Sequence, residues 1–152
     1  MEKRDDRLKD LTMLLGYSER TIDAKGRMIL PRAYRRELED GLVVTKGLDN
    51  CLLLFPMNEW ESVVGKIEEM PAGREETRRF SRLFFSNASR LMPDAQGRIL
   101  IPPHLREMAG LQKDVVVVGL SNKAEVWNPD RWSAYSGESA GSYEQAASDI
   151  GV

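Results

Sequence analysis

Short apolar runs alternate with polar turns along the chain, and most of these runs are too short to form helices. Residues 42–45 and 115–118 are rich in β-branched side chains, which are typical of strands. A polar turn follows each run, and a second apolar run follows each turn, at residues 52–55 and 124–127. The pattern therefore predicts two β-hairpins of the same design.

The segment before each hairpin is repeated as well. Residues 22–36 read IDAKGRMILPRAYRR, and residues 93–107 read PDAQGRILIPPHLRE. A constant offset of 71 positions pairs Asp23 with Asp94, Ala24 with Ala95, Gly26 with Gly97, Arg27 with Arg98, Pro31 with Pro102 and Arg35 with Arg106. So many identities at one offset indicate an internal repeat, in which each copy spans about 45 residues.

Each copy is predicted to form a β-β-α-β-β unit. The Asp-Ala-Lys/Gln-Gly segment predicts a turn in which Gly26 or Gly97 adopts a positive φ. A proline after each return strand suits the first turn of a short helix, because it has no N–H group to leave unpaired there. The predicted elements are strands at 14–22, 28–30, 88–92 and 99–101, and short helices at 32–38 and 104–108.

The sequence predicts an α+β, β-rich fold built mainly from these two tandem units. Between them, apolar residues at helical spacing predict helices at 58–70 and 75–85. The last residues are rich in Ser, Gly and Ala, and their few apolar side chains cannot offset the entropy of ordering them. The expected organisation is a flexible extension at 1–12, a first unit at 13–60, a helical connector at 61–87, a second unit at 88–132 and a flexible tail at 133–152.

Composition narrows the classes of protein that fit. With 41% hydrophobic and 30% charged residues, the chain resembles an ordinary globular protein. No apolar run approaches the roughly 20 residues of a membrane helix. The lone cysteine, Cys51, has no intramolecular disulfide partner, so we expect a cytoplasmic protein. One cysteine and one histidine, His104, leave no evident zinc cluster, and we expect no metal, no cofactor and no catalytic site.

The formal net charge of −2 argues against a uniformly basic nucleic-acid binder. The charge is unevenly distributed, however, because residues 18–36 carry six basic side chains against two acidic ones. The positive field is therefore expected to be local.

The two D-A-[KQ]-G-R turns, each followed by an apolar triplet and a proline, resemble the MraZ family of bacterial transcriptional regulators. The flanking segments GLVVTKGLDNCLLLFPMNEW and VVVVGLSNKAEVWNPDRW extend the resemblance over about residues 13–132. It implies two AbrB-like, swapped-hairpin domains, intertwined into one barrel with pseudo-twofold symmetry. It also implies a homo-oligomeric ring, associated with the nucleoid, that binds short tandem repeats in promoter DNA and represses its own division and cell-wall operon. The family's functional residues fall here on Asp23, Arg27, Asp94 and Arg98.

The chemistry of these turns suits DNA binding. An arginine guanidinium can donate two parallel hydrogen bonds to guanine O6 and N7 or clamp a phosphate, and a rigid turn limits its freedom. The aspartate four residues earlier is expected to accept N–H groups of the turn or to orient the arginine, within or across the copies. Gln96 replaces a lysine in the second copy, so that turn is expected to attract phosphates less. The remaining candidate DNA-binding residues, Lys25, Arg20 and Arg32, are expected to attract phosphates in general, and Arg35 and Arg36 are expected to add to this attraction.

Less specific interpretations fit the same features. Asp and Gly are common in turns, so the turns alone are consistent with a structural role. Arg35 and Arg36 are consistent with a solvated helix face, and Trp60, Trp127 and Trp132 with core or interface anchors.

Two other functions remain as alternatives. An enzyme is the first, although the chain has no recognisable phosphate loop or nucleophile motif. An antitoxin-like interaction module is the second, because antitoxins use the same small β-unit with a C-terminal tail that wraps a toxin.

Overall fold

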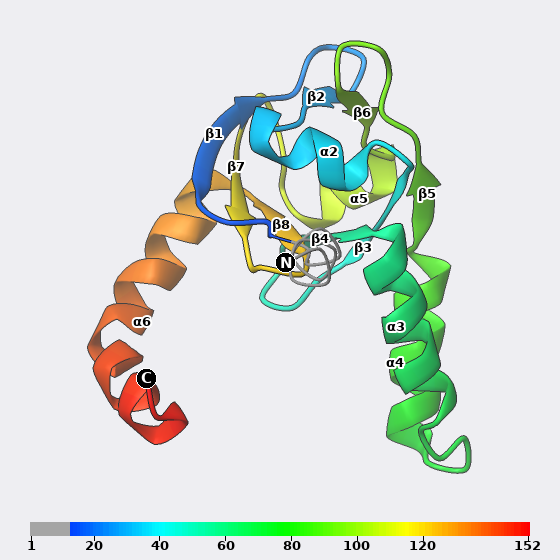
Figure 1. The fold of residues 1–152 in the computed structure, drawn as a ribbon, viewed down its shortest axis with the longest axis vertical. Helices are drawn as coiled ribbons and strands as arrows, with labels where there is room; N and C mark the ends of the chain where they lie inside the picture. Colours follow the sequence, from blue (N-terminus) through cyan, green and yellow to red (C-terminus); the bar gives the residue numbers. More distant parts are fainter. Residues whose placement is uncertain (1–12) are drawn as a thin grey trace, which may run out of the picture.

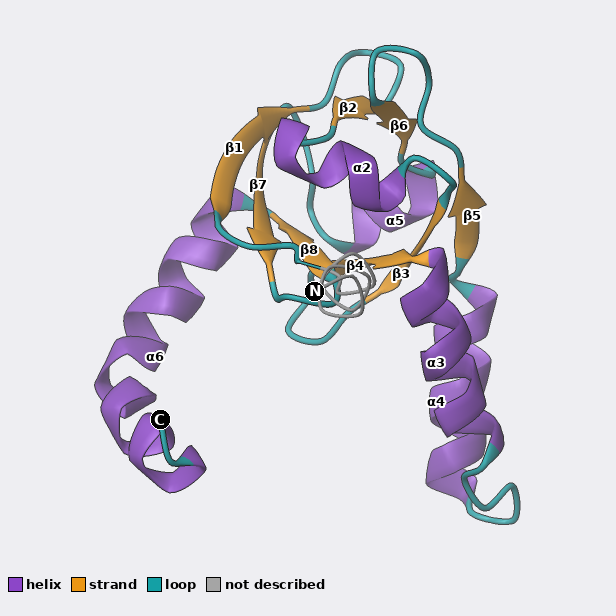
Figure 2. Cartoon of the chain, in the orientation of Figure 1, coloured by secondary structure: helices purple, strands orange, loops and turns teal. Residues whose placement is uncertain are grey.

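The computed structural model describes residues 13–152, so the predicted extension at 1–12 lies outside the described residues. The fold is α+β and rich in strands, as the sequence predicts (Figure 1, Figure 2). The first half contains β1 (Tyr17–Thr21), β2 (Arg27–Ile29), the 3-10 helix η1 (Arg32–Tyr34), α2 (Arg35–Leu38), β3 (Leu42–Lys46) and β4 (Leu52–Pro56). The helices α3 (Met57–Glu68) and α4 (Glu75–Ser86) follow. The second half contains β5 (Ser89–Leu91), β6 (Arg98–Leu100), α5 (Pro103–Met108), β7 (Asp114–Gly119), β8 (Ala124–Trp127) and α6 (Pro129–Ile150).

Strands from the two halves pair with each other in the main sheet. Its order is β1-β7-β8-β4-β3-β5, and neighbouring strands are antiparallel. The first strand of each half therefore lies beside the third strand of the other half, β1 beside β7 and β5 beside β3. Because of this exchange, neither half completes its own strand pairing without the other.

Strands β2 and β6 pair separately as a short antiparallel ribbon. The opposed residues are Arg27 with Leu100, Met28 with Ile99 and Ile29 with Arg98. The offset of the repeat exchanges the first and last of these pairs, so an approximate two-fold axis passes through the middle one. The ribbon is extended by hydrogen bonds from Leu30 N to Gly97 O (2.9 Å) and from Ile101 N to Gly26 O (3.0 Å). This pairing brings the two predicted turns to the same end of the molecule (Figure 1).

The main core lies between the sheet, the ribbon and the short helices. Side chains alternate along β7, so Val115 and Val117 face this core. Val116 packs on the opposite face of the sheet with Trp127. Because β7 is covered on both faces, its sequence is a continuous apolar run rather than an alternating one.

The helices α3 and α4 form a hairpin that an aromatic cluster attaches to the sheet (Figure 1). The ring centroid of Phe55 on β4 lies 5.7 Å from that of Trp60 on α3 and 6.2 Å from that of Phe84 on α4. The buried hydroxyl of Thr45 on β3 donates to the backbone oxygen of Phe84 at 2.7 Å. Trp60 thus anchors the hairpin, and Trp127 is buried in the cluster behind the sheet, which confirms that these tryptophans are packing anchors.

The prediction of a flexible tail at 133–152 is wrong, because this segment belongs to the long helix α6. Signals at both ends of the segment explain the helix. The side-chain oxygen of Asn128 accepts from the backbone N–H of Asp130 at 2.8 Å, and Pro129 occupies the first helical position. Gly151, with a φ of 90°, terminates the helix in the left-handed conformation.

The expectation that this segment buries little apolar surface is nevertheless confirmed, because α6 has no buried side chain. Near its start, the rings of Trp132 and Tyr135 lie 5.4 and 5.2 Å from that of Trp127. Farther along, Tyr143 and Ile150 are 75% and 77% exposed. Across residues 13–152, no helix combines the length and apolar character that crossing a bilayer requires.

Candidate functional site

The first repeated turn is organised around the carboxylate of Asp23. One oxygen, Oδ1, accepts from the backbone N–H groups of Lys25 and Arg27, both at 2.9 Å. The other oxygen, Oδ2, accepts from Nε of the Arg27 side chain at 2.8 Å. Gly26 closes the turn, because its N–H donates to the backbone oxygen of Asp23 at 3.0 Å. The aspartate therefore both satisfies the turn and orients the arginine.

The second turn repeats this arrangement. Oδ1 of Asp94 accepts from the backbone N–H groups of Gln96 (3.0 Å) and Arg98 (2.8 Å), and Oδ2 accepts from Nε of Arg98 at 2.7 Å. Each aspartate therefore has both of the roles expected for it, since it accepts N–H groups of the turn and orients the arginine. It does so within its own copy of the repeat.

Both guanidinium groups keep their outer edge open. The aspartate accepts from Nε, and within residues 13–152 Nη1 and Nη2 of Arg27 donate no hydrogen bond. In the second turn, Nη2 of Arg98 makes only a long contact of 3.5 Å to Gln96. The arginine side chains are 32% and 28% exposed. Each turn thus presents the two terminal nitrogens of a guanidinium, with their coplanar N–H donors, on a side chain that is fixed at its inner nitrogen.

Hydrogen bonding lowers the pKa of both aspartates below the usual range. For Asp23 the largest cause is the backbone N–H of Arg27, and desolvation opposes it while the Arg27 side chain and the N–H of Lys25 add to it. For Asp94 the same causes come from Arg98 and Gln96. Both carboxylates are therefore charged at neutral pH and hold their arginines as ion pairs.

Two arginines that sequence reasoning assigned no specific role connect the turns to each other. Gly26 and Gly97 have φ values of +88° and +77°, as predicted. A Cβ at Gly26 would lie 2.8 Å from Cζ of Arg106, and a Cβ at Gly97 would lie 2.5 Å from Nε of Arg35. Each guanidinium thus packs on the bare glycine of the other half's turn. We call this pair of contacts the cross-brace.

The cross-brace corrects the interpretation of Arg35 and Arg36 as one solvated helix face. Arg36 is exposed, but Arg35 is partly buried against the second turn, and its buried Nε has no hydrogen-bond partner within the described residues. Arg106 donates from Nε to the backbone oxygen of Ile101 at 3.0 Å. The repeat itself carried the signal, because Arg35 and Arg106 are separated by the same offset as the turns.

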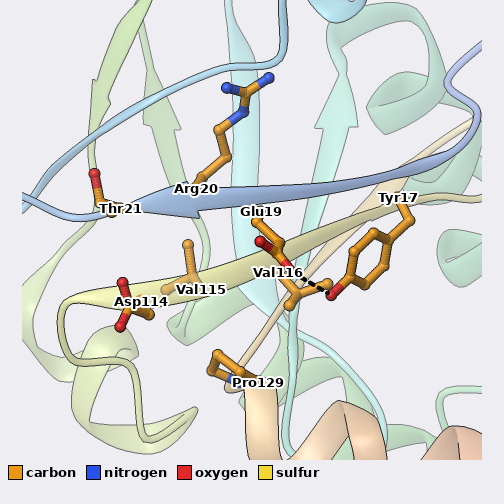
Figure 3. A pocket seen from close by; sticks show the side chains of 8 residues that line it. All are labelled: Tyr17, Glu19, Arg20, Thr21, Asp114, Val115, Val116 and Pro129. Atoms are coloured by element: carbon orange, nitrogen blue, oxygen red, sulfur yellow. Dashed lines mark hydrogen bonds between the residues drawn. The ribbon is translucent and has the colours of Figure 1, made fainter.

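The other candidate residues are less closely associated with the turns. Lys25 is exposed within the first turn, and Arg32 is exposed on η1. Arg20 lies on β1, where its guanidinium points to the side of the strand opposite Tyr17 and Glu19 (Figure 3). Its Nε is buried without a hydrogen-bond partner within the described residues, so only part of this side chain faces solvent.

The pocket beside β1 holds no evident catalytic arrangement (Figure 3). Tyr17 donates to a carboxylate oxygen of Glu19 at 3.3 Å, and desolvation followed by the charge of Glu19 raises the pKa of this tyrosine. Tyr17 therefore stays protonated at neutral pH. Over residues 13–152, no three potential metal ligands gather into a site, and His104 lies exposed on α5.

Comparison with known proteins gives one consistent result. A family model described as "MraZ protein, putative antitoxin-like" matches residues 13–83 and again residues 84–151. A "Transcriptional regulator MraZ" from Natranaerobius thermophilus is 44% identical over 138 residues, which cover 91% of this chain and 96% of the relative. Proteins of the same name from Desulforamulus reducens and Heliobacterium modesticaldum are 45% and 44% identical over 138 residues, covering 91% of this chain and 97% and 96% of the relatives.

The cross-brace predicts that alanine is poorly tolerated at Gly26 and Gly97. Either substitution forces a side chain into a left-handed backbone conformation and against a guanidinium group. We expect the free energy of unfolding to fall by about 1–3 kcal/mol for each substitution, measured by urea denaturation. Gly65→Ala is the control, because it lies within α3 with open space around it, and it should raise stability by roughly 0.5–1 kcal/mol. Unchanged stability in Gly26→Ala would refute the described packing.

The lowered aspartate pKa values predict a specific loss of stability in acid. A carboxyl group whose pKa is lower in the folded state stabilises the fold above its unfolded pKa of about 4. That contribution is lost as the pH falls through the folded value. The free energy of unfolding should therefore decrease below about pH 4 in the wild type. In Asp23→Asn,Asp94→Asn it should start lower at neutral pH and depend less on acid, and parallel pH profiles for the two proteins would contradict the assignment.

Proposed function

The chain belongs to the MraZ family, and from that premise we propose that it is a sequence-specific, DNA-binding transcriptional regulator whose base contacts are made by Arg27 and Arg98. The observation that carries the proposal is the pair of matching turns. Each holds an arginine by its inner nitrogen and leaves the two outer nitrogens for a ligand. That geometry suits the parallel acceptors of guanine in the major groove.

The two turns act as one unit in this proposal. They precede β2 and β6, so they lie at the two opposite ends of this antiparallel ribbon and are related by an approximate two-fold axis. A two-stranded ribbon is narrow enough to enter the major groove of B-DNA. In this arrangement Asp23 and Asp94 position the arginines and make no contact with DNA themselves.

Nearby cations supply attraction to the DNA backbone. Lys25 and Arg32 are exposed and suited to contact phosphates, whereas the partly buried Arg20 contributes mainly through its charge. If about four phosphates are neutralised per subunit, we expect the slope of log K against log salt to be about −3.6. The second turn, with Gln96, contributes less to this attraction.

The targets that we propose follow from the family. They are short tandem repeats in the promoter of the chain's own division and cell-wall operon, which the protein represses, acting in the cytoplasm on the nucleoid. The exchange of β1 and β5 between the halves supports the proposal that two AbrB-like units, at 13–60 and 88–132, form a swapped-hairpin barrel.

We further propose that subunits associate into a homo-oligomeric ring through α6. Exposed apolar side chains form a stripe along α6 that includes Tyr135 and Tyr143, and α4 exposes Phe80 and Leu83. The charges are complementary, because α6 carries four acidic residues and one arginine while α4 carries three arginines and two glutamates. The two elements project from opposite sides of the body (Figure 1). A contact between α6 of one subunit and α4 of the next therefore repeats head to tail, and it closes into a ring when the rotation permits.

A ring would also explain how an acidic protein binds DNA usefully. Each subunit offers only two base-contacting arginines, so its own affinity is expected to be modest. Several subunits on tandem repeats multiply these contacts through effective concentration.

The antitoxin-like alternative is favoured by the exposed stripe on α6, which is also a suitable surface for another protein. Removal of residues 137–152 distinguishes the two functions. Loss of a bound protein partner with DNA binding intact would favour the alternative. For an enzyme, no convergent set of titratable groups within the described residues offers comparable support.

The proposed base contacts predict a loss of discrimination when both arginines are removed. In Arg27→Ala,Arg98→Ala, affinity for the DNA upstream of the chain's own gene should fall by about 1–3 kcal/mol for each arginine relative to a scrambled duplex. Gel-shift titrations with both duplexes measure this. Arg32→Ala is the control, because loss of a phosphate contact should weaken binding to both duplexes equally. Discrimination that survives the double substitution would refute the proposed base contacts.

The proposed ring predicts that one face of α6 controls the oligomeric state. Tyr143→Glu places a charge in the apolar stripe and should reduce the molar mass measured by light scattering after gel filtration. Gln145→Glu is the matched control, because this exposed residue lies nearly opposite Tyr143 on the helix and bonds only to Asp149 within the described residues. Equal molar masses for both variants and the wild type would count against α6 as the contact.

A further inference from the structure

A pocket of about 460 Å³ lies directly beside the first turn. The turn supplies Asp23 and Ala24 to its wall, and the second half supplies Arg106 and Lys113. Its volume is more than ten times the roughly 30 Å³ that a water molecule occupies in the liquid, which leaves room for a phosphate group with its hydration. We propose that this pocket binds a phosphate of the DNA backbone, next to the base contacted by Arg27. The inference rests on the proposed DNA-binding function and assigns Arg106 and Lys113 to it.

Arg106 is held in position before any ligand arrives. Its Nε donates to the backbone oxygen of Ile101 at 3.0 Å, and its guanidinium packs on Gly26 in the cross-brace. Only Nε is engaged in a hydrogen bond within residues 13–152, so the outer nitrogens keep donors for an anion. A donor that is already ordered loses little entropy when it binds a phosphate.

Lys113 is attached to the turn through the backbone. Its carbonyl oxygen accepts from the N–H of Ile22 at 2.7 Å, one residue before Asp23. Its side chain is exposed and makes no ion pair within the described part of the chain. The lysine charge is therefore not neutralised by a neighbouring carboxylate.

The acidic groups near the pocket do not cancel these cations. The Asp23 carboxylate already accepts three hydrogen bonds, including the one that pairs it with Arg27. Asp114 and Asp130 line an adjoining pocket together with Lys113 but do not line this one, and within the described residues neither forms an ion pair with the lysine. The pocket thus combines two cations from the second half with a turn whose own charges are paired.

The arrangement is specific to the first turn. In the second half, Gln112 and Lys113 lie between Gly110-Leu111 and the start of β7. In the first half, Gly41 is followed directly by β3, so no residue corresponds to Lys113 there. The second turn therefore has no lysine equivalent to Lys113, and Gln96 also replaces Lys25. Both differences favour phosphate binding at the first turn.

The test compares Lys113→Gln with Lys66→Gln in the full-length protein. Lys66 is also exposed but lies on α3, away from the turns, so both variants lose one charge and only one loses the pocket (Figure 1). The probes are the duplex upstream of the chain's own gene and a scrambled duplex of equal length, each titrated at several salt concentrations. For Lys113→Gln we expect the slope of log K against log salt to become shallower by about 0.9 for each subunit in contact with DNA. Affinity for both duplexes should fall by the same factor, and Lys113→Arg should restore the wild-type slope.

The possible failures are distinguishable. If Lys113→Gln has the slope and affinity of Lys66→Gln while the wild type still prefers its own duplex, the phosphate pocket is wrong and the proposed function stands. If the wild type binds both duplexes equally, the proposed sequence specificity is wrong, and if it binds neither duplex, the pocket and the proposed function are both wrong.

Discussion

A single carboxylate determines what each repeated turn can do. Asp23 or Asp94 accepts two backbone N–H groups with one oxygen and the inner nitrogen of an arginine with the other. The same group therefore folds the turn and fixes the direction of the guanidinium. Because the bonds to the backbone favour the charged carboxylate, the ion pair persists at neutral pH. An arginine on an unsupported loop would lose more entropy on binding a base than one already held in this way.

The exchange of strands makes the two turns depend on each other. The β2–β6 ribbon places them at one end of the fold. In the cross-brace, Arg35 of the first half packs on Gly97 of the second turn, and Arg106 of the second half packs on Gly26 of the first turn. Glycine is needed at both positions for its positive φ and for the space that the guanidinium occupies. The positions of the two turns therefore depend on residues of both halves, and neither half alone contains all the contacts that hold its own turn.

The sequence predicts what is local and repeated. The offset of the repeat located both turns, their glycines and their arginines, and turn chemistry anticipated the two roles of the aspartates. The repeat also marked Arg35 and Arg106 as equivalent, but the strand order and the glycine that each arginine packs on were not predictable, because they depend on contacts between residues far apart in the chain. The helix α6 departs from the predicted flexible tail for a different reason, because low apolar content indicates little burial but does not prevent a helix, and Asn128, Pro129 and Gly151 supply capping signals. A segment can form a helix without burying its side chains, and α6 is such a helix.

In the proposed function, geometry, and not charge alone, makes the two arginines specific. The most direct measurement is binding of Arg27→Lys,Arg98→Lys to the chain's own upstream duplex and to a scrambled one across a range of salt concentrations. Lysine keeps the positive charge but has no planar fork to be held by the aspartate. We expect the preference for the upstream duplex to disappear while the salt dependence of binding to the scrambled duplex is unchanged. A double lysine variant that retains the wild-type preference would contradict it.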